Sequence, residues 1–228
     1  METIDFTPFY ISFKLALTTT VILFIIALPL AWWLSQSRCR CKPFIEAITA
    51  LPIVLPPSVI GFYIIVALSP NAALGGFFRE TFDIDLVFSF TGLVIASCFY
   101  SFPFMVQPLQ AGFESLHKNI LEASYIAGKG KITTLFKVAL PNIKPALLTA
   151  LIITFAHTVG EFGVVLMVGG MQDESTKVAS IAIYEFVNNI EYASAHIYSA
   201  IMITVSFIIL LTTYYFNLRQ NRRFGLIK

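Results

Sequence analysis

Five long apolar stretches constrain what this chain can fold into. They cover approximately Phe9–Leu34, Ile48–Leu68, Leu86–Leu109, Ala146–Val168 and Ala195–Phe216. Each has the roughly 20 residues that a helix needs to cross about 30 Å of hydrocarbon. Of the 228 residues 57% are hydrophobic and 12% are charged, whereas a soluble domain usually has about a quarter charged residues. We therefore expect an all-α membrane protein with five transmembrane helices, forming a single domain over residues 1–228.

Basic residues between the apolar stretches predict their orientation. They gather after the first, third and fifth stretches, at Arg38, Arg40 and Lys42, at Lys118, Lys129, Lys131, Lys137 and Lys144, and at Arg219, Arg222, Arg223 and Lys228. With five spans, only Lys14, Arg79 and Lys177 fall toward the other side. Because short cytoplasmic loops of membrane proteins carry an excess of Lys and Arg, this distribution predicts an external N-terminus and a cytoplasmic C-terminus.

Prolines interrupt two of the apolar stretches. The second contains Pro52, Pro56 and Pro57, and the third contains Pro103 and Pro108. Proline lacks a backbone donor, so we expect kinks that are tolerated where protein or a water-filled path satisfies the freed carbonyls. Bending for packing is the preferred explanation for Pro103 and Pro108. For Pro56, Pro57 and Ser58, helix bending and a place in a translocation path are both open.

A polar, lysine-bearing segment, Glu122–Pro141, separates the third and fourth stretches. Asn119 and Glu122 have the spacing of a capping box, and Gly128 is placed to end the helix that follows in a left-handed turn. A second helical stretch is expected over 132–139. Residues 113–145 would then form a compact knob on the cytoplasmic side. An ordinary interhelical loop would also be basic and amphipathic.

The spacing within this segment resembles the signature cytoplasmic loop of the permeases of binding-protein-dependent ABC importers. The matching positions are Glu122, Ala123, Ser124, Gly128, Val138, Leu140 and Pro141, with Ser and Val in place of the commoner Ala and Ile. Leu51–Tyr63, Ser101–Leu109 and Phe155–Gly170 are similar to the corresponding stretches of molybdate-type permeases. The resemblance implies a type I ABC importer permease fold, with residues 113–145 as the coupling loop that docks on an ATPase.

The same resemblance implies the partners and the substrate. A homodimer would enclose the pathway at its two-fold interface, in the plasma (inner) membrane of a prokaryote and surrounded by lipid. Separate ABC ATPase subunits would bind ATP and Mg, an extracytoplasmic substrate-binding protein would deliver the substrate, and this chain would bind no cofactor. An oxyanion is expected as substrate, molybdate first, with tungstate and sulfate as alternatives. Nothing implies a nucleic-acid partner.

Enzyme chemistry finds no support in the sequence. The run Gly128–Lys131 is not a Walker-type phosphate loop, because Ala123 and Tyr125 occupy the two possible first-glycine positions and no Ser or Thr follows either lysine. Zinc-protease and nucleophile-elbow motifs are also missing. Cys39, Cys41 and Cys98 provide neither a disulfide framework nor a four-ligand zinc site. A stand-alone channel or secondary transporter is the competing class, but such proteins usually show internal repeats and more intramembrane charges.

One face of the fourth stretch is small and polar. On a helical wheel it carries Ala146, Ala150, Thr154, His157 and Glu161. A glutamate in mid-span costs about 2.5–3.5 kcal/mol on insertion scales, so Glu161 is expected to face protein and to find a partner, with His157 the candidate. Two interpretations are open. The pair locks helix packing, or Glu161 lies with Gly160 and Gly163 beside the translocation path and repels anions that leak through a closed gate.

Overall fold

Helices account for every regular element in the part of the chain that the computed structural model describes, residues 5–171 and 175–223. Lys228, one of the basic residues used above for orientation, lies outside these ranges. Three helices are long and apolar enough to cross a membrane, namely α1 (Thr7–Gln36), α5 (Phe90–Glu114) and α12 (Tyr192–Arg223), the last over its part up to Thr212. The expectation of an all-helical chain is confirmed for the described residues.

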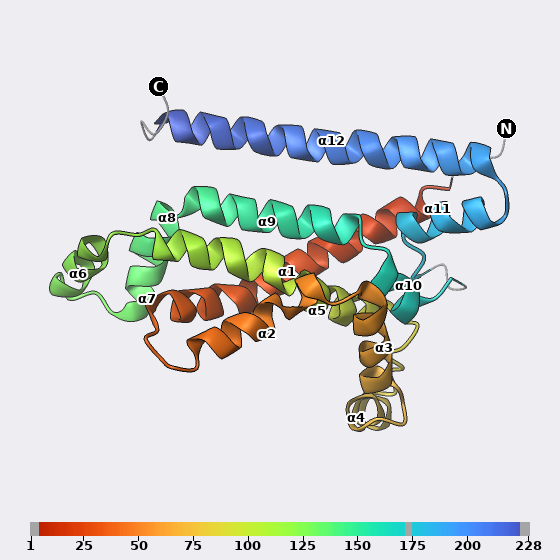
Figure 1. Cartoon of the computed structure of the whole chain (residues 1–228), viewed down its shortest axis with the longest axis horizontal. Coiled ribbons are helices and arrows are strands. Elements are labelled where there is room, and N and C mark those ends of the chain that lie inside the picture. Colours follow the sequence, from red (N-terminus) through yellow and green to blue (C-terminus); the bar gives the residue numbers. More distant parts are fainter. Residues whose placement is uncertain (1–4, 172–174, 224–228) are drawn as a thin grey trace.

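The bundle is built around α1, α5 and α9 (Lys144–Val159), which run side by side (Figure 1). Ala27 and Ala31 of α1 and Ala150 of α9 are fully buried in its core. Small residues at such contacts let helix backbones approach closely in a membrane, where packing must hold the helices together. Toward the end of α1 the Trp32 ring packs edge-on against Phe113 of α5, with centroids 5.0 Å apart.

The last helix, α12, lies along one side of the bundle (Figure 1). Its most extensive contacts are with α9 and with α11 (Ala179–Asn188), a short helix that precedes it, and its Tyr198 ring stacks on Phe9 of α1. Only 11% of its most apolar window is buried, and Ile203, Phe207 and Leu211 are exposed. Since an apolar helix that is exposed on most sides suits a lipid environment, this arrangement agrees with the membrane class predicted from composition.

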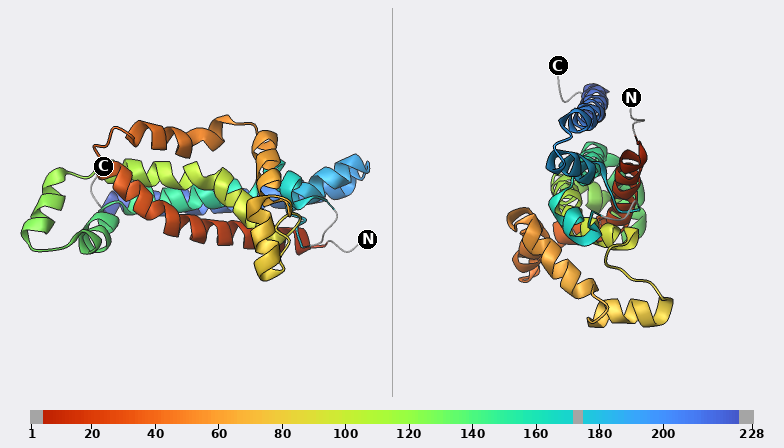
Figure 2. Two further views of the ribbon diagram at one scale, coloured as in Figure 1. Left: turned by 90° about the horizontal axis from the view of Figure 1, so that it is seen from below. Right: turned by 90° about the vertical axis from the view of Figure 1, so that its right-hand side faces the viewer.

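The second apolar stretch is broken. It forms α2 (Lys42–Val54) and α3 (Pro57–Leu68), and the chain bends by 110° between them. The kink expected at Pro56 and Pro57 is confirmed, and it divides the span expected over 48–68 into two helices. We call Lys42–Leu68 the α2–α3 arm; with α4 (Ala73–Phe82), its outer half projects away from the bundle (Figure 2). In contrast, Pro103 and Pro108 are contained within the single helix α5.

The fourth apolar stretch is broken as well. Helix α9 ends at Val159, the segment Gly160–Phe162 follows, and α10 (Gly163–Gly169) begins a new helix. The prediction of a continuous helix over 146–168 is therefore wrong. Before α9, the helical segment Lys131–Asn142 meets it at 83°. The described residues thus offer three uninterrupted spans, or as many as five if each bent pair is one span.

Candidate functional site

The coupling loop projects beyond the ends of α5 and α9 (Figure 1). It contains α6 (Lys118–Ile126), α7 (Lys131–Thr134), a π-helical turn η1 (Leu135–Ala139) and α8 (Leu140–Asn142). The predicted capping box is wrong, because α6 begins at Lys118 and its N-cap residue, His117, makes no side-chain capping hydrogen bond. Gly128 has φ 76°, the left-handed conformation that its position predicts.

A buried hydrogen bond holds the two helical parts of the coupling loop together. Ser124 Oγ of α6 lies 2.9 Å from Thr134 Oγ1 of α7, and both side chains are buried. Leu121 and Leu135 extend the bundle core into the loop. The sequence suggested Ser124 only as a small residue, and its hydroxyl contact was missed because Thr134 lies across a turn. The loop is therefore an ordered continuation of the bundle.

Apolar side chains are exposed at the end of the coupling loop. Tyr125, Ile126, Ile132 and Phe136, which we call the tip patch, are all exposed, Ile126 to 87%. Beside them a pocket of about 330 Å³ is lined by the end of α1, the end of α5, and Glu122 and Tyr125 of α6. Ala123 is exposed, whereas Val138 and Leu140 are half-buried. An exposed apolar patch on an ordered, polar loop is typical of a protein-docking surface.

The two broken helices contact each other at their breaks. A Cβ atom placed on Gly163, the first residue of α10, would lie 2.7 Å from the Cβ of Pro57, the first residue of α3. One turn further along α3, a Cβ on Gly61 would lie 2.7 Å from the Cβ of Met167. Pro57 and Gly163, predicted separately for the translocation path, are therefore neighbours. Pro56 and Ser58, beside Pro57, are exposed.

Glu161 lies within the break between α9 and α10. It is 4% exposed, and its backbone carbonyl accepts a hydrogen bond of 2.6 Å from Ser180 Oγ of α11. This contact satisfies a carbonyl that the broken helix leaves without a helical partner. Neither carboxylate oxygen has a hydrogen-bond partner among the described residues. The expectation that Glu161 faces protein is confirmed.

The expected pairing of Glu161 with His157 is wrong. His157 Nδ1 lies 3.0 Å from Ser101 Oγ of α5, and its ring stacks on Phe104 with centroids 4.0 Å apart. Ser101 Oγ is also 2.9 Å from Thr158 Oγ1. This contact between hydroxyl groups was not predicted. Its sequence signal is the presence of Ser101 and Thr158 in two otherwise apolar stretches. Thr154 and Ala150, on the small and polar face of the fourth stretch, are buried.

Comparison with known proteins finds one family match. Residues 27–223 match the model of the binding-protein-dependent transport system inner membrane component. The chain belongs to this family. Within the described residues there is no group of three or more His, Cys, Asp or Glu that could hold a metal ion.

Named relatives and solved structures agree with this family. The molybdenum transport system permease protein ModB of Azotobacter vinelandii is 43% identical over 220 residues, 96% of this chain and 95% of that protein. The sulfate transport system permease protein CysT of Salmonella typhimurium is 29% identical, over 87% of this chain and 72% of that protein. A chain of the MetNI methionine ABC transporter, in inward-facing conformations, superposes with a TM-score of 0.73 at 15% identity. The match covers 93% of this chain and 94% of that one.

A bacterial ABC transporter that imports alginate also has this fold. One of its chains superposes with a TM-score of 0.74 at 17% identity, covering 93% of this chain and 79% of that one. At such low identities the likeness concerns the fold alone. It confirms the type I ABC importer permease fold that the resemblance implied.

Proposed function

We propose that this chain is the membrane-spanning permease subunit of an ABC importer that carries molybdate into the cytoplasm. The observation that carries the proposal is the 43% identity to a molybdenum transport system permease over 96% of this chain. Sulfate is the second candidate, because sulfate permeases are also related, at 29% identity. Tungstate, a tetrahedral dianion like both, is the third.

The coupling loop is proposed to dock on a separate ABC ATPase, which binds ATP and Mg. Support comes from the exposed tip patch and from the Ser124–Thr134 contact, which make the loop an apolar surface on an ordered base. The basic residues Lys129, Lys131 and Lys137 in this loop support a cytoplasmic position for it by the positive-inside rule, with the N-terminus outside. ATP-driven closure of two ATPase subunits would then move the loop as a rigid lever.

The translocation path is proposed to run past the contact between Pro57 and Gly163 in a homodimer. Two helix breaks meet there, and irregular backbone at membrane depth is tolerated where protein buries it or a cavity lines it. The α2–α3 arm exposes Val54, Phe62 and Tyr63, an apolar surface that a second copy of the chain would cover. Glu161, next to this contact, is buried without a hydrogen-bond partner for its carboxyl group among the described residues and offers no positive charge to bind an anion. A substrate-binding protein would deliver the anion from outside.

Reconstitution in liposomes tests this proposal. We expect the chain alone to carry no molybdate down a gradient, and uptake to require the ATPase, ATP hydrolysis and the substrate-binding protein. Parallel assays with molybdate, tungstate and sulfate identify the substrate. Downhill flux through the chain alone at transporter-like rates would contradict the proposal and support a channel or secondary transporter.

A further inference from the structure

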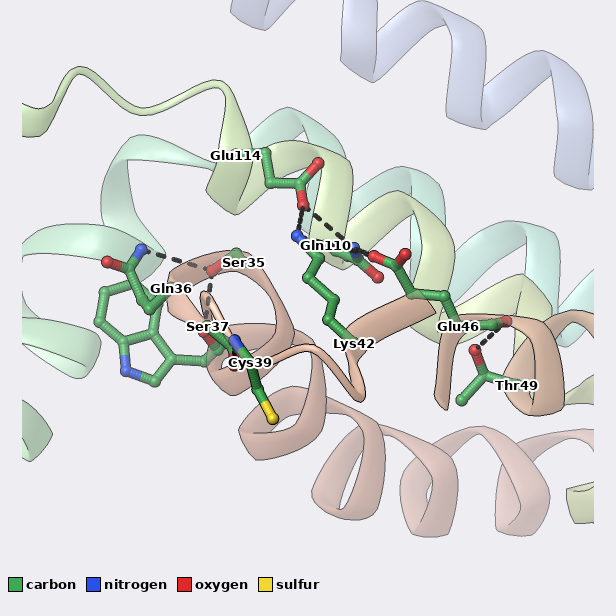
Figure 3. Close-up of polar contacts among 10 residues, drawn as sticks. Ser35, Gln36, Ser37, Cys39, Lys42, Glu46, Thr49, Gln110 and Glu114 are labelled. Atoms are coloured by element: carbon green, nitrogen blue, oxygen red, sulfur yellow. Dashed lines mark hydrogen bonds and ion pairs between the residues drawn. The ribbon is translucent and has the colours of Figure 1, made fainter. Parts of the chain in front are cut away.

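Four polar side chains connect the beginning of α2 to the end of α5 (Figure 3). Lys42 Nζ lies 2.9 Å from Glu114 Oε1, and Gln110 Nε2 donates to Glu46 Oε1 at 2.5 Å and to Glu114 Oε1 at 3.0 Å. Lys42 also lies 3.6 Å from Glu46 within α2. We call Lys42, Glu46, Gln110 and Glu114 the α2–α5 latch. Each member contacts at least two others, so the four side chains form one network.

The latch lies next to the coupling loop. Glu114 is the last residue of α5, and the chain reaches α6 at Lys118. Glu114 also lines the pocket of about 330 Å³ to which Glu122 and Tyr125 of α6 contribute. The end of α5 that carries the latch is therefore linked to α6 by residues 115–117 and by a shared pocket.

The α2–α3 arm is attached to the rest of the molecule in both of its halves. The latch holds its first residue, Lys42, while Pro57 and Gly61 pack closely against α10 in its outer half. Between these points α2 contributes few buried residues, Thr49 and Pro52, and Leu51 and Val54 are exposed. Ile45 packs partly buried against the bundle core, so the latch adds a polar, directional contact to a limited apolar one between α2 and α5.

We propose that the α2–α5 latch is a positioning element that makes the α2–α3 arm move together with α5 and α6. Through it, a displacement imposed on the coupling loop would reach the Pro57–Gly163 contact along the arm as well as along α9. The inference rests on the proposed function. The chemistry of the latch suits this role, because an ion pair and amide hydrogen bonds fix the relative orientation of the two helices and can re-form after each transport cycle.

The test uses the complete complex of permease, ATPase and substrate-binding protein in liposomes. Lys42→Met removes the charge and keeps the side-chain length, and Lys42→Arg keeps the charge. Arg79→Met is the matched control, since it removes another exposed ion pair, Arg79 Nε to Asp85 Oδ1 at 3.7 Å, away from the latch. Assembly, ATP hydrolysis and anions transported per ATP are measured for each variant.

We expect Lys42→Met to assemble and hydrolyse ATP while transporting at least fivefold fewer anions per ATP. Lys42→Arg and Arg79→Met should keep the wild-type ratio. Exchanging the charges, Lys42→Glu with Glu114→Lys, should restore most of the ratio that Lys42→Glu alone loses. A purely stabilising contact would lower the amount of complex and leave the ratio unchanged.

A wild-type ratio in Lys42→Met would overturn the inference. If Lys42→Met fails to assemble, the variant with exchanged charges, Lys42→Glu with Glu114→Lys, provides the test. The inference is also overturned if that complex assembles but transports few anions per ATP. Failure of the proposed function is distinguishable, since the wild-type chain would then transport without ATP or would not bind an ATPase at all.

Discussion

The local structure favours glycine at positions 128 and 163 for different physical reasons. Gly128 has φ 76° and open space around it, so backbone conformation alone restricts that position. Gly163 has an ordinary φ, but a Cβ atom there would collide with the rigid ring of Pro57. The first was predictable from sequence, because a glycine after a helical pattern is a local signal. The second was not, since its partner lies in another helix.

Gly128→Val is expected to abolish transport while membrane insertion is retained. A β-branched residue is strained at φ 76°, so the angle between α6 and α7 should change. Gly130→Val is the matched control, because Gly130 has φ −71° and also nothing within 4 Å of a Cβ. Uptake and ATPase binding are measured for both; unchanged uptake in Gly128→Val would count against the lever assignment.

Gly163→Ala is expected to destabilise the protein by about 1–3 kcal/mol, the usual cost of overpacking a rigid contact. Gly160→Ala should cost less, because its Cβ would meet its nearest neighbours at 3.7 and 3.8 Å. Thermal unfolding of the two purified variants measures the difference. Equal midpoints would show that Pro57 does not pack on Gly163.

Apolar stretches that were all expected to span a membrane formed both continuous and broken helices. The stretches that form α1 and α5 remain single helices despite Pro29, Pro103 and Pro108. The second and fourth stretches are broken, at Pro56 and at Gly160–Phe162. Hydropathy measures transfer into lipid and not backbone continuity, so the segments were predictable while the second break was not. That break depends on Ser180 of a later helix, which supplies the hydrogen bond to Glu161.

Within the coupling loop, Ser124→Ala is expected to cost about 1–2 kcal/mol, because the Thr134 hydroxyl would be left buried without its partner. Adding Thr134→Val should recover part of the loss, since both polar groups are then removed. Denaturation of the single and double variants measures this coupling. Additive losses would argue that the two hydroxyls do not stabilise each other.

The two candidate sites of the molecule lie at opposite ends of one bundle. The tip patch lies at the end of the coupling loop, and the contact between the two helix breaks lies toward α10, with α1, α5 and α9 between them (Figure 1). Apolar composition and the spacing of the loop motif predicted this class of protein correctly. The His157–Ser101 contact and the α2–α5 latch were not predictable, because each joins residues that are distant in sequence.

Crosslinking of the coupling loop to the ATPase tests the central claim most directly. Ile126→Cys places a thiol on the most exposed apolar residue of the tip patch, in a chain whose exposed Cys39 and Cys41 are replaced by serine. Phe82→Cys, exposed on α4, is the control. The account predicts an ATPase crosslink from position 126 and none from position 82. Consistent absence of the first crosslink, in a complex that still transports, would contradict it.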